Sequence, residues 1–275
     1  MLSMLELAID TLPEKRLYRF RSIDHERLER SSRIFTHSEL YFASPTQLND
    51  PWEAKPHIVI GDLGAPAYKV KYVTWVSQMM MASRPENDPE KVREWLENHT
   101  QERAEELAQE QRNGYQRSLE GYRICSFSDN VTHPLLWSHY SGSHKGFCLE
   151  FDASTDIFGH AMKVTYQTEY PSIDITEPDE DINLRLSVLT KAQFWAYEGE
   201  YRLVSMEPNE PGALPVNYHI FHFPTHLLTG VIFGCQMPQA DKDLIMQWSD
   251  GSARPIQYSR MVKSATAFAL EVVAA

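Results

Sequence analysis

Cysteine is scarce in this 275-residue chain, and long apolar runs are missing from it. The three cysteines, Cys125, Cys148 and Cys235, form no CxxC pair and are odd in number. This pattern excludes a disulfide scaffold and a cysteine zinc knuckle, and it favours a reducing, cytoplasmic compartment. No window approaches the ~20 apolar residues of a membrane helix, and the early acid Glu6 is unlike the basic start of a signal peptide. We therefore expect neither export by that route nor a membrane span.

The charge of the chain is one-sided. It has 38 Asp and Glu against 26 Lys and Arg, which gives a net charge of -12. An acidic balance argues against broad binding of nucleic acid through its phosphates, although it leaves room for a local basic groove. With 42% hydrophobic and 11% aromatic residues, the chain has ample material for a core, so disorder is excluded as its main state.

Short strand patterns alternate irregularly with helical ones along the chain. Strands are expected at 17–21, 40–43, 124–128, 146–151, 198–204 and 228–234, with more in 265–273. Helices are expected at 88–112, 134–140, 184–195 and 239–248, and an exposed acidic loop at 171–183. Regular βαβ alternation is missing, which argues against a Rossmann or barrel fold. The pattern predicts an α+β fold in one domain over 1–275, with a compact, mostly antiparallel sheet and a helical insertion at about 66–120.

Most familiar catalytic motifs are missing, including the Walker A loop, GxGxxG, HExxH, GxSxG and the kinase set. The strongest remaining cluster is Glu198, Glu200 and Arg202, because residues two apart on a strand share one face. Two carboxylates ~7 Å apart on one face can divide the work of catalysis. One would stabilise a cationic sugar transition state and the other would orient an acceptor. The alternative is an exposed strand whose acids pair with Arg202 and nearby basic residues.

Hydroxyl and aromatic side chains form a second cluster. Ser126 and Ser128 share a strand face and are suited to hold a ribose, while the helix with Trp137, His139 and Tyr140 is suited to stack a flat ring. The alternative is a serine pair on a solvated strand edge.

Two arginines form a third candidate. Arg19 and Arg21 lie on one face of the first strand, where they can clamp a phosphate or ribose bidentately. The expected partner is therefore a small anionic ligand such as a dinucleotide.

Metal binding is not expected from the histidines. A strand would place His219 and His222 on opposite faces, and Pro224 breaks helical spacing toward His226. A metal-dependent nuclease or phosphodiesterase stays an alternative, although a basic track for nucleic acid is missing. The histidines and acids available for such a site are His133, His139, His144, Asp50, Glu53, Glu150 and Asp152. A structural turn is the default interpretation for Asn49 and Asp50.

Five motifs in a fixed order resemble the bacterial domain-of-unknown-function family 2971 (DUF2971). They span about residues 17–235, and the family name implies no activity. The motifs are Leu17-Tyr18-Arg19-Phe20-Arg21; Leu40 to Pro45 with Asn49-Asp50-Pro51-Trp52-Glu53; Cys125-Ser126-Phe127-Ser128; Leu136 to Tyr140 with His144 to Asp152; and Trp195 to Arg202.

The chain also resembles, more loosely, ADP-ribosyltransferases of the arginine-serine-glutamate type, which have an early strand arginine, middle-strand hydroxyls and a late E-x-E. This resemblance implies that Arg19 or Arg21 holds the phosphates or ribose of NAD, and that Ser126 or Ser128 supports the nicotinamide ribose. It implies that Glu200 bonds the 2'-hydroxyl and Glu198 orients an acceptor. The middle motif departs from the usual Ser-Thr-Ser pattern, and fold analogy is an association only.

Three functions are weighed on this basis. The first is an NAD-consuming transferase or glycohydrolase with Glu200 as the catalytic carboxylate, in which Trp137, Tyr140 or Tyr201 shields the reacting carbon from water. The second is a non-catalytic module whose aromatic residues bind a ligand or partner. The third is the metal-dependent nuclease. The sequence does not identify the acceptor.

Overall fold

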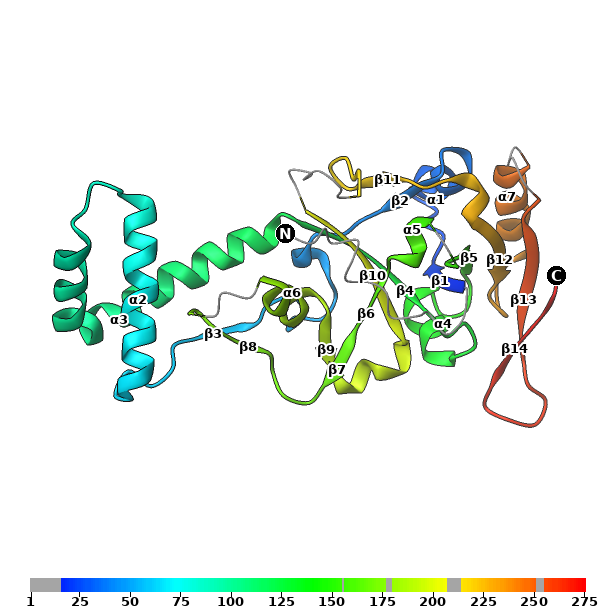
Figure 1. Ribbon diagram of the computed structural model, residues 1–275. Coiled ribbons are helices and arrows are strands. Elements are labelled where there is room, and N and C mark those ends of the chain that lie inside the picture. The colour runs from blue at the N-terminus through cyan, green and yellow to red at the C-terminus, as the bar shows by residue number, and fades with distance from the viewer. Residues whose placement is uncertain (1–15, 155, 177–179, 207–213, 251–254) are drawn as a thin grey trace. The chain divides into compact units, whose positions relative to one another are not determined.

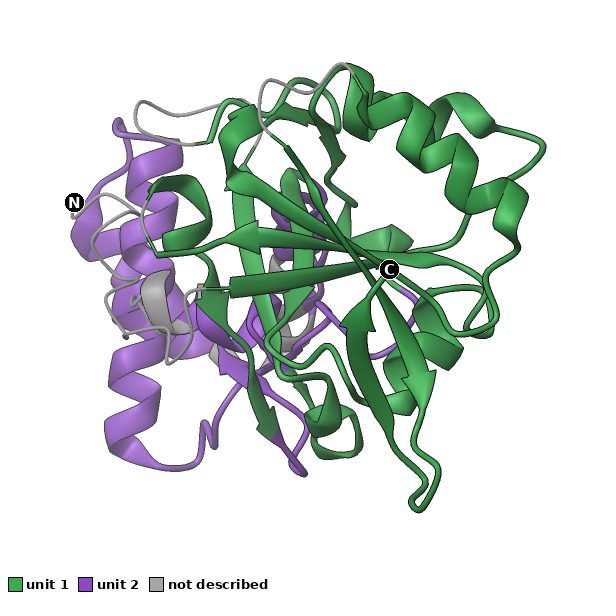
Figure 2. Cartoon of the chain, turned by 90° about the vertical axis from the view of Figure 1, so that its right-hand side faces the viewer, with its two compact units in different colours: residues 1–48, 121–166, 191–275 green, residues 49–120, 167–190 purple. Residues whose placement is uncertain are grey.

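We analysed the protein as a computed structural model, which describes residues 16–154, 156–176, 180–206, 214–250 and 255–275. The chain packs as two compact units (Figure 2). Unit 1 consists of residues 1–48, 121–166 and 191–275, and unit 2 of residues 49–120 and 167–190. The chain therefore enters unit 2 twice, and the prediction that residues 1–275 form one domain stays a prediction.

Unit 1 is built on an eight-stranded sheet with the order β14-β13-β12-β5-β1-β4-β10-β6 (Figure 1). All neighbouring strands in it are antiparallel except β12 and β13. The predicted α+β fold with a mostly antiparallel sheet is therefore confirmed. The strands are β1 (Arg16–Arg21), β4 (Tyr122–Ser128), β5 (Phe147–Asp152), β6 (Met162–Lys163), β10 (Glu200–Met206), β12 (Leu228–Phe233), β13 (Gln257–Lys263) and β14 (Leu270–Ala274).

Short elements surround this sheet. Strands β2 (Glu39–Tyr41) and β11 (Ile220–His222) pair with each other, and β7 (Thr165–Gln167) and β9 (Thr190–Ala192) lie where the chain passes from one unit to the other. The α-helices are α1 (Leu28–Thr36), α4 (Pro134–Tyr140), α5 (Asp156–Gly159) and α7 (Gln239–Ser249). The 3-10 helices are η1 (Pro45–Gln47), η2 (Gln193–Glu198) and η3 (Thr225–Leu227).

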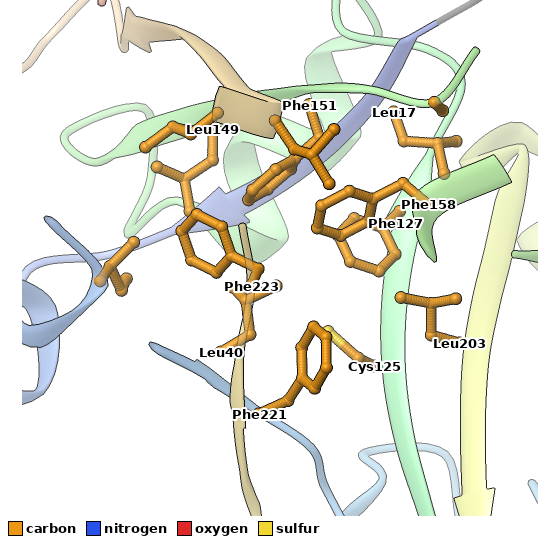
Figure 3. Close-up of a cluster of buried hydrophobic side chains, with 14 of the residues drawn as sticks. Leu17, Leu40, Cys125, Phe127, Leu149, Phe151, Phe158, Leu203, Phe221 and Phe223 are labelled. Carbon is orange, nitrogen blue, oxygen red and sulfur yellow. The ribbon is translucent and has the colours of Figure 1, made fainter. Parts of the chain in front are cut away.

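The two faces of the sheet bury different side chains, because successive strand residues point to opposite sides. Leu17, Phe127 and Leu149 join one large core, which also takes in Phe221 and Phe223 (Figure 3). The opposite face has a smaller core, made by Trp137 of α4, Cys148, Ile232, Met261 and Leu270, against which Tyr18 and Phe20 pack. Side chains at even and odd positions of β1 therefore lie in different environments.

Unit 2 has its own small core. It contains the parallel pair β3 (His57–Val59) and β8 (Ser172–Asp174) and the helices α2 (Pro66–Ser83), α3 (Pro89–Glu120) and α6 (Glu180–Val188). Helices α2 and α3 fill the predicted helical insertion, and the backbone N–H of Glu90 donates to Asp88 Oδ1 at 3.0 Å, as the predicted N-cap requires. The core residues are Ile58, Tyr72, Val73, Val76, Leu96, Ile173 and Ile175.

Three predicted boundaries were wrong for packing reasons. Helix α3 was predicted to end near Arg112 but continues through Gly114 to Glu120. Its last turns are held by Leu119, which is buried, and by Tyr115, which packs against the core of unit 2. The predicted loop at 171–183 contains β8, whose Ile173 lies in the core of unit 2. The predicted helix at 184–195 is instead the end of α6, strand β9 and the start of η2.

No described helix is both long enough and apolar enough to cross a membrane.

Candidate functional site

A buried network of four charged side chains lies beside strand β10. Lys191 Nζ donates to Glu198 Oε2 at 2.6 Å and to Glu200 Oε2 at 3.0 Å. Arg202 donates to the same Glu200 carboxylate, from Nε to Oε1 at 2.8 Å and from Nη2 to Oε2 at 3.1 Å. The side chains of Lys191, Glu198 and Glu200 are 5% exposed and that of Arg202 is 0% exposed. Two positive and two negative charges are thus removed from water together, and each carboxylate has a cationic partner.

The strand register explains how the sequence assembles this network. Glu200 and Arg202 lie on one face of β10, opposite Ser128 and Ser126 of β4. Strand β9 supplies Lys191, and η2 then turns the chain back toward β10. The predicted common face of Glu200 and Arg202 is confirmed. Glu198 belongs to η2 rather than to a strand, yet its carboxylate joins the network through Lys191.

Gly199 makes the turn between the two glutamates. Its φ of 51° and ψ of 48° are in the left-handed region, and a Cβ added there would lie 2.0 Å from Asp129 Oδ1. Only glycine adopts this conformation without strain. The glycine of the E-G-E motif is therefore what allows Glu198 and Glu200 to reach the same lysine.

We expect Gly199→Ala to lower the free energy of unfolding by about 1–3 kcal/mol, because the new Cβ meets both the strained φ and Asp129. The matched control is Gly114→Ala inside α3, where the nearest atom to a new Cβ is 3.9 Å away. That control should gain about 0.5–1 kcal/mol from helix propensity. Urea unfolding of both variants tests this, and equal effects at the two positions would contradict the proposed role of Gly199.

Hydroxyl groups complete the bonding of the two acids. Tyr140 of α4 donates to Glu198 Oε1 at 2.5 Å, and Ser126 bonds the Glu200 carboxylate. The Ser128 hydroxyl donates to the Glu198 backbone carbonyl, and the Glu200 backbone N–H donates to the Tyr166 hydroxyl oxygen at 2.8 Å. Helix α4 and strand β4 therefore both hold the network in place.

The electrostatics keep the two cations of the network charged at neutral pH. Burial lowers the pKa of Lys191 by itself, but the two carboxylates outweigh this and the net shift is upward. Burial raises the pKa of the Glu200 carboxyl, and the positive charge of Lys191 opposes that rise. Burial also lowers the pKa of Arg202 to about 9, which leaves the guanidinium charged. The ionised state of Glu200 thus depends on its cationic neighbours.

An aromatic cluster adjoins this network. Lys191 Nζ lies 5.2 Å from the centre of the Trp195 ring, and Trp195 and Tyr197 of η2 are 6.0 Å apart. His139 of α4 packs edge-on against Trp195 at 6.2 Å, and His133 stacks on Tyr197 at 4.9 Å with 21° between the rings. His139 is exposed, and the other three rings are half-buried. The rings therefore form a partly exposed surface beside a buried charge network.

The predicted arginines do not join this site. Arg19 and Arg21 alternate with Tyr18 and Phe20, and Tyr18 is in register with Ser128, so the arginines project to the face opposite Glu200. Arg19 Nη1 donates to the Ser126 backbone carbonyl at 2.7 Å instead. The expectation that Arg19 or Arg21 faces the same ligand as Glu200 is therefore corrected by the strand register.

Several other predicted ligand contacts are core residues. Trp137 is fully buried, and Tyr201 is buried in the large core on the other sheet face. Ser128 is buried and bonded to the Glu198 backbone, while Arg202 is bonded to Glu200. The side chains of these residues are buried or bonded within the protein, so they stabilise the site rather than contact a ligand. Of the predicted set, His139 and Tyr140 are the ones near the partly exposed rings.

The residues of the nuclease alternative are distributed over both units. Asp50 and Glu53 are buried in unit 2, whereas His139, Glu150 and Asp152 belong to unit 1. Glu150 pairs with Arg16, and Asp152 accepts from the backbone N–H of Ser154 at 2.9 Å. Among the described residues, no group of three or more His, Cys, Asp and Glu side chains is arranged to hold a metal ion.

Sequence analysis missed Lys191 and Trp195 as site residues, and it considered His133 only as a metal ligand. Lys191 was placed inside an expected helix, although a lysine in the apolar run Val188-Leu189-Thr190-Lys191-Ala192 was a signal of a buried ion pair. His133 and Trp195 are far apart in the chain. The contacts of His133 with Tyr197 and of His139 with Trp195 depend on how α4 packs against η2.

Comparison with known proteins adds one finding. The family model DUF2971, described as a protein of unknown function, matches residues 136–203. The predicted resemblance to this family is confirmed over residues 136–203. The DUF2971 match spans a quarter of the chain, and all four members of the ion network lie within it. No curated protein and no solved structure matches the chain.

Proposed function

We propose that this DUF2971 protein binds a small ligand through a planar ring that stacks on the aromatic cluster of Trp195, Tyr197 and His139. The observation that carries the proposal is the gathering of these partly exposed rings, 6.0 to 6.5 Å apart, over the buried ammonium of Lys191. Ligand sites in proteins are lined mainly by aromatic and apolar groups, with a few fixed polar ones among them.

The rings are held before any ligand arrives. Trp195 rests on Lys191, and Tyr197 is stacked on His133. Rings that are already fixed lose little conformational entropy when a ligand stacks on them. The neighbouring Phe194, which is 65% exposed and 5.7 Å from Trp195, extends the aromatic surface toward solvent.

The buried network fits the role of a rigid support for this surface. Glu198 is bonded by Lys191 and Tyr140, and Glu200 by Lys191, Arg202 and Ser126. Acids that are buried and bonded in this way have few free acceptor positions for a substrate. Their positions fix η2 and therefore the angle at which Trp195 and Tyr197 meet a ligand.

Calorimetric titration with adenosine and with NAD tests the proposal, since both carry flat rings. We expect Trp195→Ala to weaken binding by about five- to twelvefold, the loss of one stacking contact of about 1–1.5 kcal/mol. The control is Trp52→Ala, because Trp52 is 60% exposed and belongs to unit 2. Equal affinities in wild type and Trp195→Ala, with intact folding by circular dichroism, would rule the aromatic site out.

The second candidate function is NAD consumption with Glu200 as the catalytic carboxylate and Glu198 as its partner. It is favoured by one observation, the convergence of Glu198, Glu200, Ser126 and Tyr140 beside aromatic rings. The same titration samples should be assayed for released nicotinamide. Release by wild type that Glu200→Gln abolishes would support this second candidate, whereas binding without release supports the first.

A further inference from the structure

Arg21, at the end of β1, is a half-buried cation without a counter-charge. Its Nε is buried and has no hydrogen-bond partner. It lies on the face of the sheet opposite the Glu198 and Glu200 network, because it alternates with Phe20 along β1. Within the described part of the chain, no carboxylate pairs with the Arg21 guanidinium. A charge in that position is costly unless something outside the protein satisfies it.

Its nearest charged neighbours are positive. Arg19 of the same strand and Arg30 of α1 lie close enough that their charges, after burial itself, lower the pKa of Arg21 to about 10. Arg21 is therefore still a cation at neutral pH. Cys125 does not supply the missing negative charge, because burial raises the pKa of its thiol and leaves it neutral.

Arg19 is fixed in place beside Arg21. Its Nη1 donates to the Ser126 carbonyl at 2.7 Å and its Nη2 to the Tyr41 carbonyl at 3.1 Å, and the guanidinium lies 5.7 Å from the centre of the Phe127 ring. Backbone carbonyls orient the group without cancelling its positive charge. The arginines are thus pre-organised at the sheet rather than spread over a mobile surface.

Three other arginines of unit 1 are paired with acids. Arg16 is bonded to Glu150, Arg33 to Glu39, and Arg202 to Glu200. In a chain with 12 more acids than bases, Arg21 instead has two positive neighbours, Arg19 and Arg30, whose charges act on it. Arg19, Arg21 and Arg30 therefore form a local basic site, which is compatible with the negative net charge of the whole chain.

We propose that Arg21, together with Arg19 and Arg30, forms a site for a phosphate group on the sheet face opposite the acid network. The planar guanidinium presents paired N–H donors that match two phosphate oxygens, and a doubly charged anion would supply the counter-charge that Arg21 lacks. The group is either free phosphate or the phosphate of an ester, and both have the same chemistry at the arginines.

Titration with inorganic phosphate and with AMP, in chloride buffer of matched ionic strength, tests this site. We expect wild type to bind both or the ester alone, and Arg21→Met to bind at least about tenfold more weakly. The matched control is Arg260→Met, an exposed arginine on β13. Equal affinity for the two anions identifies free phosphate as sufficient. Tighter binding of AMP identifies an ester only where Arg21→Met weakens it, because adenine stacked on the aromatic cluster would not depend on Arg21.

Thermal melting separates this role from a structural one. Without phosphate, Arg21→Met should melt no lower than wild type, because the variant no longer buries an unpaired charge. If Arg21→Met does not fold, Arg30→Gln, whose side chain is exposed, should still weaken phosphate binding by about threefold or more. The proposal is overturned if wild type binds neither anion, or if the arginine variants bind as tightly as wild type. Adenosine carries no phosphate, so its binding to Arg21→Met tests the aromatic site separately.

Discussion

Lys191→Met is expected to lower the free energy of unfolding by about 3–5 kcal/mol, which is the usual cost of removing one partner from a buried ion pair. The substitution leaves Glu198 without its 2.6 Å partner and Glu200 without its 3.0 Å partner, in side chains that are 5% exposed. Arg202 remains to neutralise Glu200, so Glu198 bears most of the loss. Urea unfolding at pH 7 measures the effect.

The stability deficit of Lys191→Met should depend on pH, whereas a deficit caused only by lost packing would not. Burial raises the pKa of the Glu200 carboxyl in the folded state, and without Lys191 the rise above the unfolded chain is no longer opposed by that lysine. The folded variant then binds more protons, so its stability rises as the pH falls and the deficit shrinks toward pH 4–5, near the ordinary carboxyl pKa of about 4.3. The control is Lys145→Met, an exposed lysine, which should change stability by less than about 0.5 kcal/mol. A deficit independent of pH would contradict an electrostatic role for Lys191.

Trp137→Ala is the second substitution with a large expected effect, a loss of about 3–5 kcal/mol. Trp137 is fully buried, its Nε1 donates to the Val131 carbonyl at 2.6 Å, and its ring meets Phe20 edge-on at 5.1 Å. It anchors α4 to the sheet, and α4 carries His139 and Tyr140. Because these residues belong to the proposed site, we expect the variant to bind adenosine more weakly as well as to unfold more easily.

Two measurements separate these consequences. Urea unfolding gives the loss of stability, and calorimetry below the unfolding transition gives the affinity for adenosine. Trp52→Ala again serves as the exposed control and should change stability by less than about 0.5 kcal/mol. A destabilised Trp137→Ala protein that binds adenosine with unchanged affinity would show that α4 does not position the ligand surface.

Local patterns predicted the elements that depend on local chemistry. The helix predicted at 134–140 is α4, with the same bounds, and the strand patterns located β1, β4, β5 and β12. The E-G-E motif indicated two acids that lie close together, and both bond Lys191, because Gly199 and the alternation of β10 are properties of a short segment.

Long-range packing decided what the sequence did not predict. The face to which Arg19 and Arg21 point depends on the register of β1 against β4, which the amino-acid pattern of β1 alone does not contain. The sequence pattern placed Lys191 in a predicted helix. In the structure it belongs to β9, and its ammonium bonds both Glu198 and Glu200. The burial of Trp137 and Tyr201 likewise comes from the cores on the two sheet faces, since an aromatic residue suits a ligand site and a core equally well.

A crystal structure of the protein with NAD or adenosine bound tests the central claim most directly. We predict that a ring of the ligand stacks on Trp195 or Tyr197, with ring centres about 4.5–7 Å apart, while Lys191 stays bonded to Glu198 and Glu200. A ligand ring bound elsewhere, with Trp195 and Tyr197 left in contact with solvent, would contradict the proposed function.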